Sequence, residues 1–439
     1  MVFGIRQLQY VLVTSMASVL PLLVGFGFTT SEEYYIIPSP SDQCTTEHCL
    51  TLTQFAVNSS YYLTSDTTLI FAPGNHSLES KFIVENVQSF SMFSESTFSP
   101  NHAVIVCNQH ANLKVTNVVI VTVIGFNEFV GCIENRVESV DKFHLKDSGF
   151  HGQAKVNSTA LIIVSETNTT LDRTSFLSNV GNEQERESPF LTGGGAIMSV
   201  HSSITITQSW FEGNSARVGG AIYSEHSSIT IFNSTFLRNH ALACGGAMYA
   251  GSGSTVNICD SKFVQNSVLV SGGVFYIPQG ASNVTINIIH SQFIANVNNN
   301  TQMYGFGAVC RSVSDNSSIT FIYSEFFNNH GFSVVDMFSG EWTIAHSEFN
   351  NNNVYNMVVR IVSATSVTVA HNHFINNNVY IVLGLFSGIL IQNSCNKFME
   401  NSAIYDVYVG PACKPGYIAP HSAVLTVLNA LTTGIETSL

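Results

Sequence analysis

Histidines and carboxylates are the side chains in this sequence that could transfer protons or hold a metal ion. His201 and His226 each precede Ser-Ser-Ile-Thr-Ile, and His346 and His371 share the same 25-residue offset. Such pairs could form a site only in a fold that stacks the two segments, and the simpler interpretation is a shared turn position. The sequence contains neither Cys-x-x-Cys nor His-x-x-x-His. We therefore expect no metal site and no cofactor.

Acidic residues that converge on one sugar would indicate hydrolysis of a glycosidic bond. Asp occurs at nine scattered positions, no two of them adjacent, and Gly-His-Gly is absent. Stacking could bring Glu212 near Glu225, but solvated surface positions are the simpler interpretation. A calcium-dependent lyase would need clustered acids beside a basic residue. We therefore expect no catalytic residues, because the arginines are spread without matching acid clusters. These arginines are Arg173, Arg217, Arg238, Arg311 and Arg360.

A repeat explains most of the residues that recur. From Phe176 onward, Phe-x-x-Asn occurs nine times, and its successive Phe residues are 23 to 35 positions apart. A Gly-Gly pair follows several copies. The motif members are Phe176, Asn179, Phe211, Asn214, Phe236, Asn239, Phe263, Asn266, Phe293, Asn296, Phe326, Asn329, Phe349, Asn352, Phe374, Asn377, Phe398 and Asn401. The glycine pairs are Gly194, Gly195, Gly219, Gly220, Gly245, Gly246, Gly272 and Gly273.

The residues before each Phe alternate between polar and apolar types, as in Ser203-Ile-Thr-Ile206 and Ser228-Ile-Thr-Ile231. This alternation of β-branched residues predicts half-buried strands, and no helical periodicity appears. A repeat of about 25 residues is short for a propeller blade of about 40 residues but holds about three short strands. We therefore predict an all-β, single-stranded parallel β-helix, a solenoid of about nine or more coils. Phe would form a stacked interior column, Asn a turn ladder tolerant of left-handed backbone, and Gly a corner of close backbone approach.

The chain divides into four predicted parts. Residues 1–30 carry Arg6 and an apolar run, typical of a signal peptide or a signal anchor. Residues 31–140 lack the regularly spaced repeat and are predicted as an N-terminal cap with early coils, because a solenoid needs its first edge covered. Residues 141–405 are the repeats, and 406–439 are a C-terminal tail or cap, in which 423–431 could form a short helix.

Composition and modification motifs indicate secretion. Charged residues are only 10% of the chain and the net charge is −13, without a basic cluster, so nucleic-acid binding is not expected. Nine cysteines fit an oxidising compartment, with Cys44–Cys49 as a candidate disulfide and Cys107–Cys132 and Cys395–Cys413 as further options. Cys244, Cys259 and Cys310 are predicted to be buried. Eight glycosylation sequons agree: Asn58, Asn75, Asn157, Asn168, Asn233, Asn283, Asn299 and Asn316.

The alternation of Gly-Gly-Ala-Ile with Phe-x-x-Asn over about residues 145–405 resembles the repeats of the chlamydial polymorphic membrane proteins. That resemblance implies a right-handed β-helix of the pectin-lyase-like type with an adhesin role. The family also ends in an outer-membrane barrel, which is not carried over to this chain. The segments Cys49-Leu-Thr-Leu52 and Thr68-Leu-Ile-Phe-Ala-Pro-Gly-Asn-His76 are similar to the start of predicted secreted β-helix proteins of marine invertebrates.

These observations predict a non-enzymatic extracellular or cell-surface protein with an adhesive, structural or glycan-contacting role. The alternative is a carbohydrate-active enzyme, a polysaccharide lyase or hydrolase, because many right-handed β-helices belong to that class. Expected partners are glycans or other extracellular proteins. Membrane contact is expected only through an uncleaved N-terminal segment.

Overall fold

The computed structural model describes residues 31–39, 48–95, 102–108, 111–132, 134–152, 158–181, 193–300 and 307–409. The predicted signal segment, Cys44, Asn157, Cys413 and the predicted helix at 423–431 lie outside these residues. Within them, no helix is long and apolar enough to cross a membrane.

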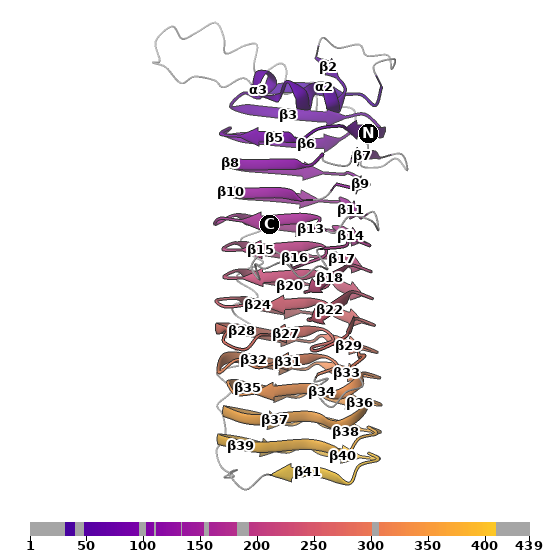
Figure 1. Ribbon diagram of the computed structural model, residues 1–439, viewed down its shortest axis with the longest axis vertical. Coiled ribbons are helices and arrows are strands. Elements are labelled where there is room, and N and C mark those ends of the chain that lie inside the picture. The colour runs from indigo at the N-terminus through magenta and orange to yellow at the C-terminus, as the bar shows by residue number, and fades with distance from the viewer. Residues whose placement is uncertain are drawn as a thin grey trace, which may run out of the picture.

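The chain winds into a stack of coils whose strands pair in parallel with those of the next coil (Figure 1). The predicted all-β parallel solenoid is therefore confirmed. One side of the stack is a 13-stranded sheet with one strand from each coil, more coils than the nine that carry Phe-x-x-Asn. Its strands are β4 (Gly74–Leu78), β7 (Ala103–Cys107), β9 (Glu128–Val130), β11 (Gly149–His151), β14 (Ser175–Leu177), β17 (Trp210–Glu212), β21 (Thr235–Leu237), β25 (Lys262–Val264), β29 (Gln292–Ile294), β33 (Glu325–Phe327), β36 (Glu348–Asn350), β38 (His373–Ile375) and β40 (Lys397–Met399).

A 28-stranded sheet forms the rest of the solenoid wall. Its strands up to residue 225 are β1 (Glu32–Ile36), β2 (Cys49–Leu50), β3 (Asp66–Phe71), β5 (Phe82–Glu85), β6 (Ser89–Ser94), β8 (Leu113–Ile124), β10 (Asn135–Lys146), β12 (Leu161–Val164), β13 (Asn168–Asp172), β15 (Ile197–Val200), β16 (Ser203–Thr207), β18 (Ser215–Val218) and β19 (Ile222–Glu225). The later ones are β20 (Ser228–Phe232), β22 (His240–Cys244), β23 (Met248–Ala250), β24 (Thr255–Cys259), β26 (Ser267–Val268), β27 (Phe275–Ile277), β28 (Ser282–Ile289), β30 (Val297–Asn298), β31 (Cys310–Ser312), β32 (Asn316–Ile322), β34 (His330–Phe338), β35 (Glu341–Ala345), β37 (Asn353–Ala370), β39 (Ile381–Ser394) and β41 (Tyr405–Val409).

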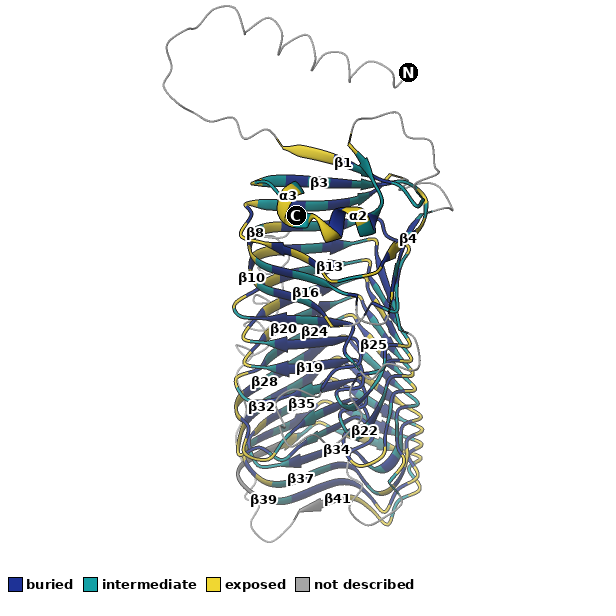
Figure 2. Ribbon diagram, turned by 45° about the horizontal axis from the view of Figure 1, so that its top comes forward, coloured by how far each residue is buried: buried dark blue, intermediate teal, exposed yellow. Residues whose placement is uncertain are grey.

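The interior is a continuous apolar core, seen as the dark blue positions that alternate along the strands (Figure 2). Phe side chains of the 13-stranded sheet stack in one column, with centroids 4.6 Å apart between Phe211 and Phe236 and 4.3 Å apart between Phe326 and Phe349. The column includes all nine motif Phe residues and starts two coils earlier, at Phe129 and then Phe150. Stacked aromatic rings stabilise one another beyond the contribution of the area that each ring buries.

The motif Asn residues form a ladder of side-chain amides at one corner. Asn266 Nδ2 donates to the Phe236 carbonyl at 2.9 Å and to Asn296 Oδ1 at 3.1 Å, and Asn266 Oδ1 accepts from the backbone and side chain of Asn239. One detail of the prediction was wrong: the left-handed residue is not Asn but the one before it, such as Gln265 at φ 53°. The Asn side chain can therefore point inward while its neighbour makes the bend.

A second ladder, not predicted from the sequence, lies at the other end of the three-residue strands. Buried serines hold this corner, and each again follows a left-handed residue, as Ser234 follows Asn233. Ser234 Oγ accepts from the Ser209 backbone N–H at 3.0 Å and donates to the Phe232 carbonyl at 2.9 Å. Two polar ladders thus flank the Phe column and keep successive coils in register.

The glycine pairs make the corner predicted for them. Gly245 has φ +69°, which favours glycine, whereas Gly246 needs space: a Cβ there would lie 2.1 Å from the Gly273 carbonyl oxygen of the next coil. At the N-terminal end, helices α2 (Leu52–Val57) and α3 (Ser59–Tyr62) lie beside the first coil (Figure 1). Thr51 caps α2, and Leu52, Phe55 and Ala56 are buried in the core.

Candidate functional site

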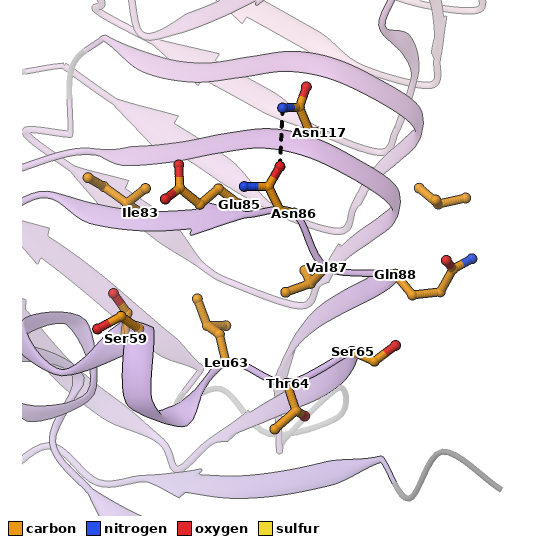
Figure 3. A pocket seen from close by; sticks show the side chains of 12 residues that line it. Ser59, Leu63, Thr64, Ser65, Ile83, Glu85, Asn86, Val87, Gln88 and Asn117 are labelled. Carbon is orange, nitrogen blue, oxygen red and sulfur yellow. Dashed lines mark hydrogen bonds between the residues drawn. The ribbon is translucent and has the colours of Figure 1, made fainter. Parts of the chain in front are cut away.

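A groove near the N-terminal end lies between α3, β5 and β8, and we call it the N-terminal groove (Figure 3). It encloses about 870 Å³. Its polar lining consists of hydroxyls, amides and one carboxylate, and its apolar lining consists of Leu63, Ile83, Val87 and Val119. The full lining is Ser59, Ser60, Leu63, Thr64, Ser65, Ile83, Glu85, Asn86, Val87, Gln88, Asn117 and Val119.

The coil stack builds this groove from turns that face the same side. Asn86 and Asn117 both have left-handed backbone, with φ 56° and 55°, and Asn117 Nδ2 donates to Asn86 Oδ1 at 3.3 Å. Glu85 is the single charged residue of the lining. A pocket with one carboxylate cannot supply the acid and base pair that glycoside hydrolysis requires. Amides, hydroxyls and small apolar patches are instead the groups that bind the hydroxyls and C–H faces of a sugar.

A second groove, which we call the charged groove, lies on the outward face of β8, β10, β13, β16 and β20 and encloses about 530 Å³. Arg173 donates to both oxygens of Asp147, at 2.6 and 2.9 Å, and lies 2.9 Å from Asp172. Asp172 also lies 3.7 Å from Lys146 and accepts from Thr207 at 2.9 Å. Hydrogen bonding by Asp147 raises the pKa of Arg173. Both carboxylates are therefore held by cations rather than presented as a free pair.

His144 is the residue of the charged groove that could act as a base. Its partial burial lowers the pKa of the imidazole below the ordinary value, and the nearby Lys142 ammonium lowers it further. A neutral imidazole can accept a proton at physiological pH. The sequence contained no local signal for this groove, because its lining comes from five coils.

The histidine pairs named from the sequence do stack. The rings of His201 and His226 lie 4.8 Å apart, and those of His346 and His371 lie 4.9 Å apart. The second pair extends through Tyr323 to His290. All of these residues have left-handed backbone and exposed side chains, so they occupy shared turn positions on the outside.

For four of the five arginines named from the sequence, the structure shows ion pairs that the sequence did not indicate. Besides Arg173, the Arg238 guanidinium binds Glu212. Arg311 and Arg360 both lie beside the fully buried Asp336, at 3.9 and 2.8 Å. These pairs form across neighbouring coils, which sequence distance hides. Glu212 and Glu225 are not brought together: Glu212 binds Trp210 and Arg238, whereas Glu225 accepts from Tyr223.

The cysteines divide into bonded and free groups. Cys107 and Cys132 form a disulfide between successive coils, which confirms one of the candidate pairings. Cys49 is also disulfide-bonded. The pairing of Cys395 with Cys413 was wrong, because Cys395 is a free thiol on an exposed turn. The prediction of burial was correct for Cys310 but wrong for Cys244 and Cys259, which are only half-buried.

The predicted glycosylation sites lie on the surface wherever the structure describes them. The described sequon asparagines are all exposed: Asn58, Asn75, Asn168, Asn233, Asn283, Asn299 and Asn316. Several lie at corners of the coils, where a glycan would extend away from the wall. Glycosylation of these positions stays a prediction.

Comparison with known proteins gives no family for this chain. No protein-family model matches, and no curated protein matches. Among solved structures, the chain is similar to PfbA, a surface adhesin of Streptococcus pneumoniae, with 12% identity over 84% of this chain and 92% of that chain and a TM-score of 0.34. It is also similar to the periplasmic alginate epimerase AlgG, with 7% identity over 76% and 78% of the two chains and a TM-score of 0.32. The mannuronan C-5 epimerase AlgE4 A-module of Azotobacter vinelandii shows 9% identity over 83% and 94% and a TM-score of 0.29. At these scores, function has to be argued from the residues of this chain.

Proposed function

We propose that this chain is a non-enzymatic extracellular or cell-surface solenoid that contacts glycans through its N-terminal groove. The observation that supports this most is the lining of the groove: hydroxyls, amides and apolar side chains around a single carboxylate, Glu85. Such a lining can bind a sugar by hydrogen bonds and by contact with its C–H faces. It offers no second acid that could cleave a glycosidic bond.

An extracellular location is supported by the covalent chemistry of the chain. The Cys107–Cys132 disulfide joins two coils, and disulfides persist in oxidising compartments. The described sequon asparagines are exposed and could accept glycans. The flat, stacked wall also suits an adhesive or structural role, because solenoids present extended binding surfaces.

The proposal is tested with the secreted full chain on a glycan array, followed by solution titration of any glycan that binds. The double variant Glu85→Gln/Gln88→Ala should weaken binding about tenfold, which corresponds to about 1.4 kcal/mol. Lys262→Ala, an exposed residue of β25 on another side of the stack, serves as the matched control. Absence of binding to any glycan, or equal binding by the double variant, would reject the N-terminal groove.

A carbohydrate-active enzyme is the second candidate, and the charged groove favours it. A neutral His144 could remove the proton from the carbon next to a uronate carboxylate, and elimination would then expel the glycosidic oxygen. Lys146 and Arg173 lie in the same groove and could face the uronate carboxylate. Incubation with acidic polysaccharides and detection of the unsaturated product by ultraviolet absorbance tests this candidate. Activity that His144→Gln abolishes would replace the non-enzymatic proposal.

A further inference from the structure

Three residues with different metal-binding groups meet on the outer corner of two successive coils. Cys259 ends β24, and Asp260 follows it in the left-handed conformation, at φ 50°. His290 occupies the same corner one coil later, because Cys259 pairs with Ile289 in the parallel register. The stack therefore places residues about thirty positions apart next to each other.

The distances among these groups suit a metal ion. The Cys259 thiol donates to Asp260 Oδ2 at 3.2 Å, and His290 Nδ1 lies 4.0 Å from Asp260 Oδ1. One ligand atom from each residue lies within 4.8 Å of the others. Tetrahedral zinc has bonds of about 2.0–2.3 Å, which places its ligand atoms about 3.3–3.8 Å apart. Asp260 and His290 are exposed, so small side-chain rotations close the remaining distance.

We propose that Cys259, Asp260 and His290 bind a divalent transition-metal ion of the zinc class, with the fourth position open to solvent. Sulfur and imidazole ligands favour such ions over calcium and magnesium, which prefer oxygen. This site is distinct from both grooves and does not depend on the proposed glycan contact.

One feature of the surroundings prepares the site. The Tyr323 ring stacks on His290 with centroids 5.2 Å apart and limits the orientations of the imidazole. A bound cation would displace the proton of the Cys259 thiol to solvent, and the resulting thiolate would bind the cation. No oxidant or reductant takes part in this exchange.

Cobalt(II) is the probe for the test, because cobalt bound to a thiolate gives a near-ultraviolet charge-transfer band. The full chain, with free thiols reduced and the reductant removed, is titrated with cobalt(II) and then with zinc(II). We expect the band to saturate at one equivalent and to disappear when zinc displaces cobalt. A chain that shows no thiolate band refutes the site.

The variants separate this site from other thiols and histidines. Cys259→Ser should abolish the band, and Asp260→Asn or His290→Ala should each weaken zinc binding at least tenfold. Cys395→Ser is the matched control, because Cys395 is an exposed free thiol in the same corner column. A band that survives Cys259→Ser, or zinc affinity unchanged by both Asp260→Asn and His290→Ala, overturns the assignment. Circular dichroism confirms that each variant keeps the sheet structure.

Discussion

A buried asparagine in this solenoid uses its whole side-chain amide to connect three coils. Asn266 is completely buried, and its amide reaches Phe236 and Asn239 on one side and Asn296 on the other. Removal of one such amide leaves the groups on both sides without partners. A buried polar group without a partner costs about 1–3 kcal/mol.

We therefore expect Asn266→Ala to lower the free energy of unfolding by about 3–5 kcal/mol, since more than one buried group loses its partner. Urea denaturation followed by circular dichroism measures the change. Lys262→Ala, four residues earlier and exposed, should change it by less than about 0.5 kcal/mol. Equal midpoints for the two variants would show that the amide ladder does not stabilise the stack.

His144 predicts a pH dependence at the same scale. Its folded-state pKa lies below the unfolded value of about 6.5, so the unfolded chain binds this proton first as the pH falls. The stability that depends on neutral His144 is complete above about pH 6.5 and is lost as the pH falls through the folded-state pKa. The free energy of unfolding, measured at about pH 7.5 and at about pH 5, should therefore change less between the two pH values for His144→Gln than for the unchanged chain. A difference as large in the variant would contradict the assignment.

Local motifs predicted the elements of one coil well, because each lies within a few residues. Phe-x-x-Asn and Gly-Gly marked a strand and two corners. The Phe column begins two coils earlier than the motif predicted. Phe129 and Phe150 belong to the column but lack an Asn three residues later, so they do not match Phe-x-x-Asn. The Ser ladder, the Arg–Asp pairs and both grooves join different coils, and the coils vary in length. Such contacts depend on which residues of successive coils lie opposite each other, and the local motifs do not predict that register.

The glycine corner allows a prediction for one element. Gly246→Ala would place its Cβ against the backbone carbonyls of Gly273 and Ser267, whereas Gly280→Ala meets no atom within 4 Å and is strained only by its φ of +79°. We expect Gly280→Ala to cost about 1–2 kcal/mol, the usual strain of a left-handed residue. Gly246→Ala should cost about 3 kcal/mol or more, because backbone cannot move aside without shifting a coil. Thermal unfolding of both variants checks this order, and the reverse order would contradict close approach as the role of Gly246.

At the scale of the whole molecule, a solenoid has open edges at its ends, and unpaired strand edges can associate with other chains. Here α2 packs its buried side chains onto the first coil at the N-terminal end. Phe55 is the center of that contact: its ring lies 5.2 Å from Tyr34, 5.3 Å from Tyr62 and 5.7 Å from Phe82. The long stack below has no comparable dependence on one side chain, because each coil has neighbours on both sides.

Phe55→Ala should therefore release the cap before it unfolds the stack. Loss of a buried Phe costs about 3–5 kcal/mol, enough to expose the edges of β4 and β5, which contact α2 and pair on one side only, with β7 and β8. We expect faster hydrogen exchange in β4 and β5, unchanged exchange in β20 and β24, and oligomers in size-exclusion chromatography with light scattering. Tyr61→Ala is the control, because Tyr61 is a neighbouring aromatic residue with 82% of its surface exposed. A variant that stays monomeric with protected β4 and β5 would show that α2 is not what shields this end. Exchange that rises equally in every coil would show that cap and stack unfold as one unit.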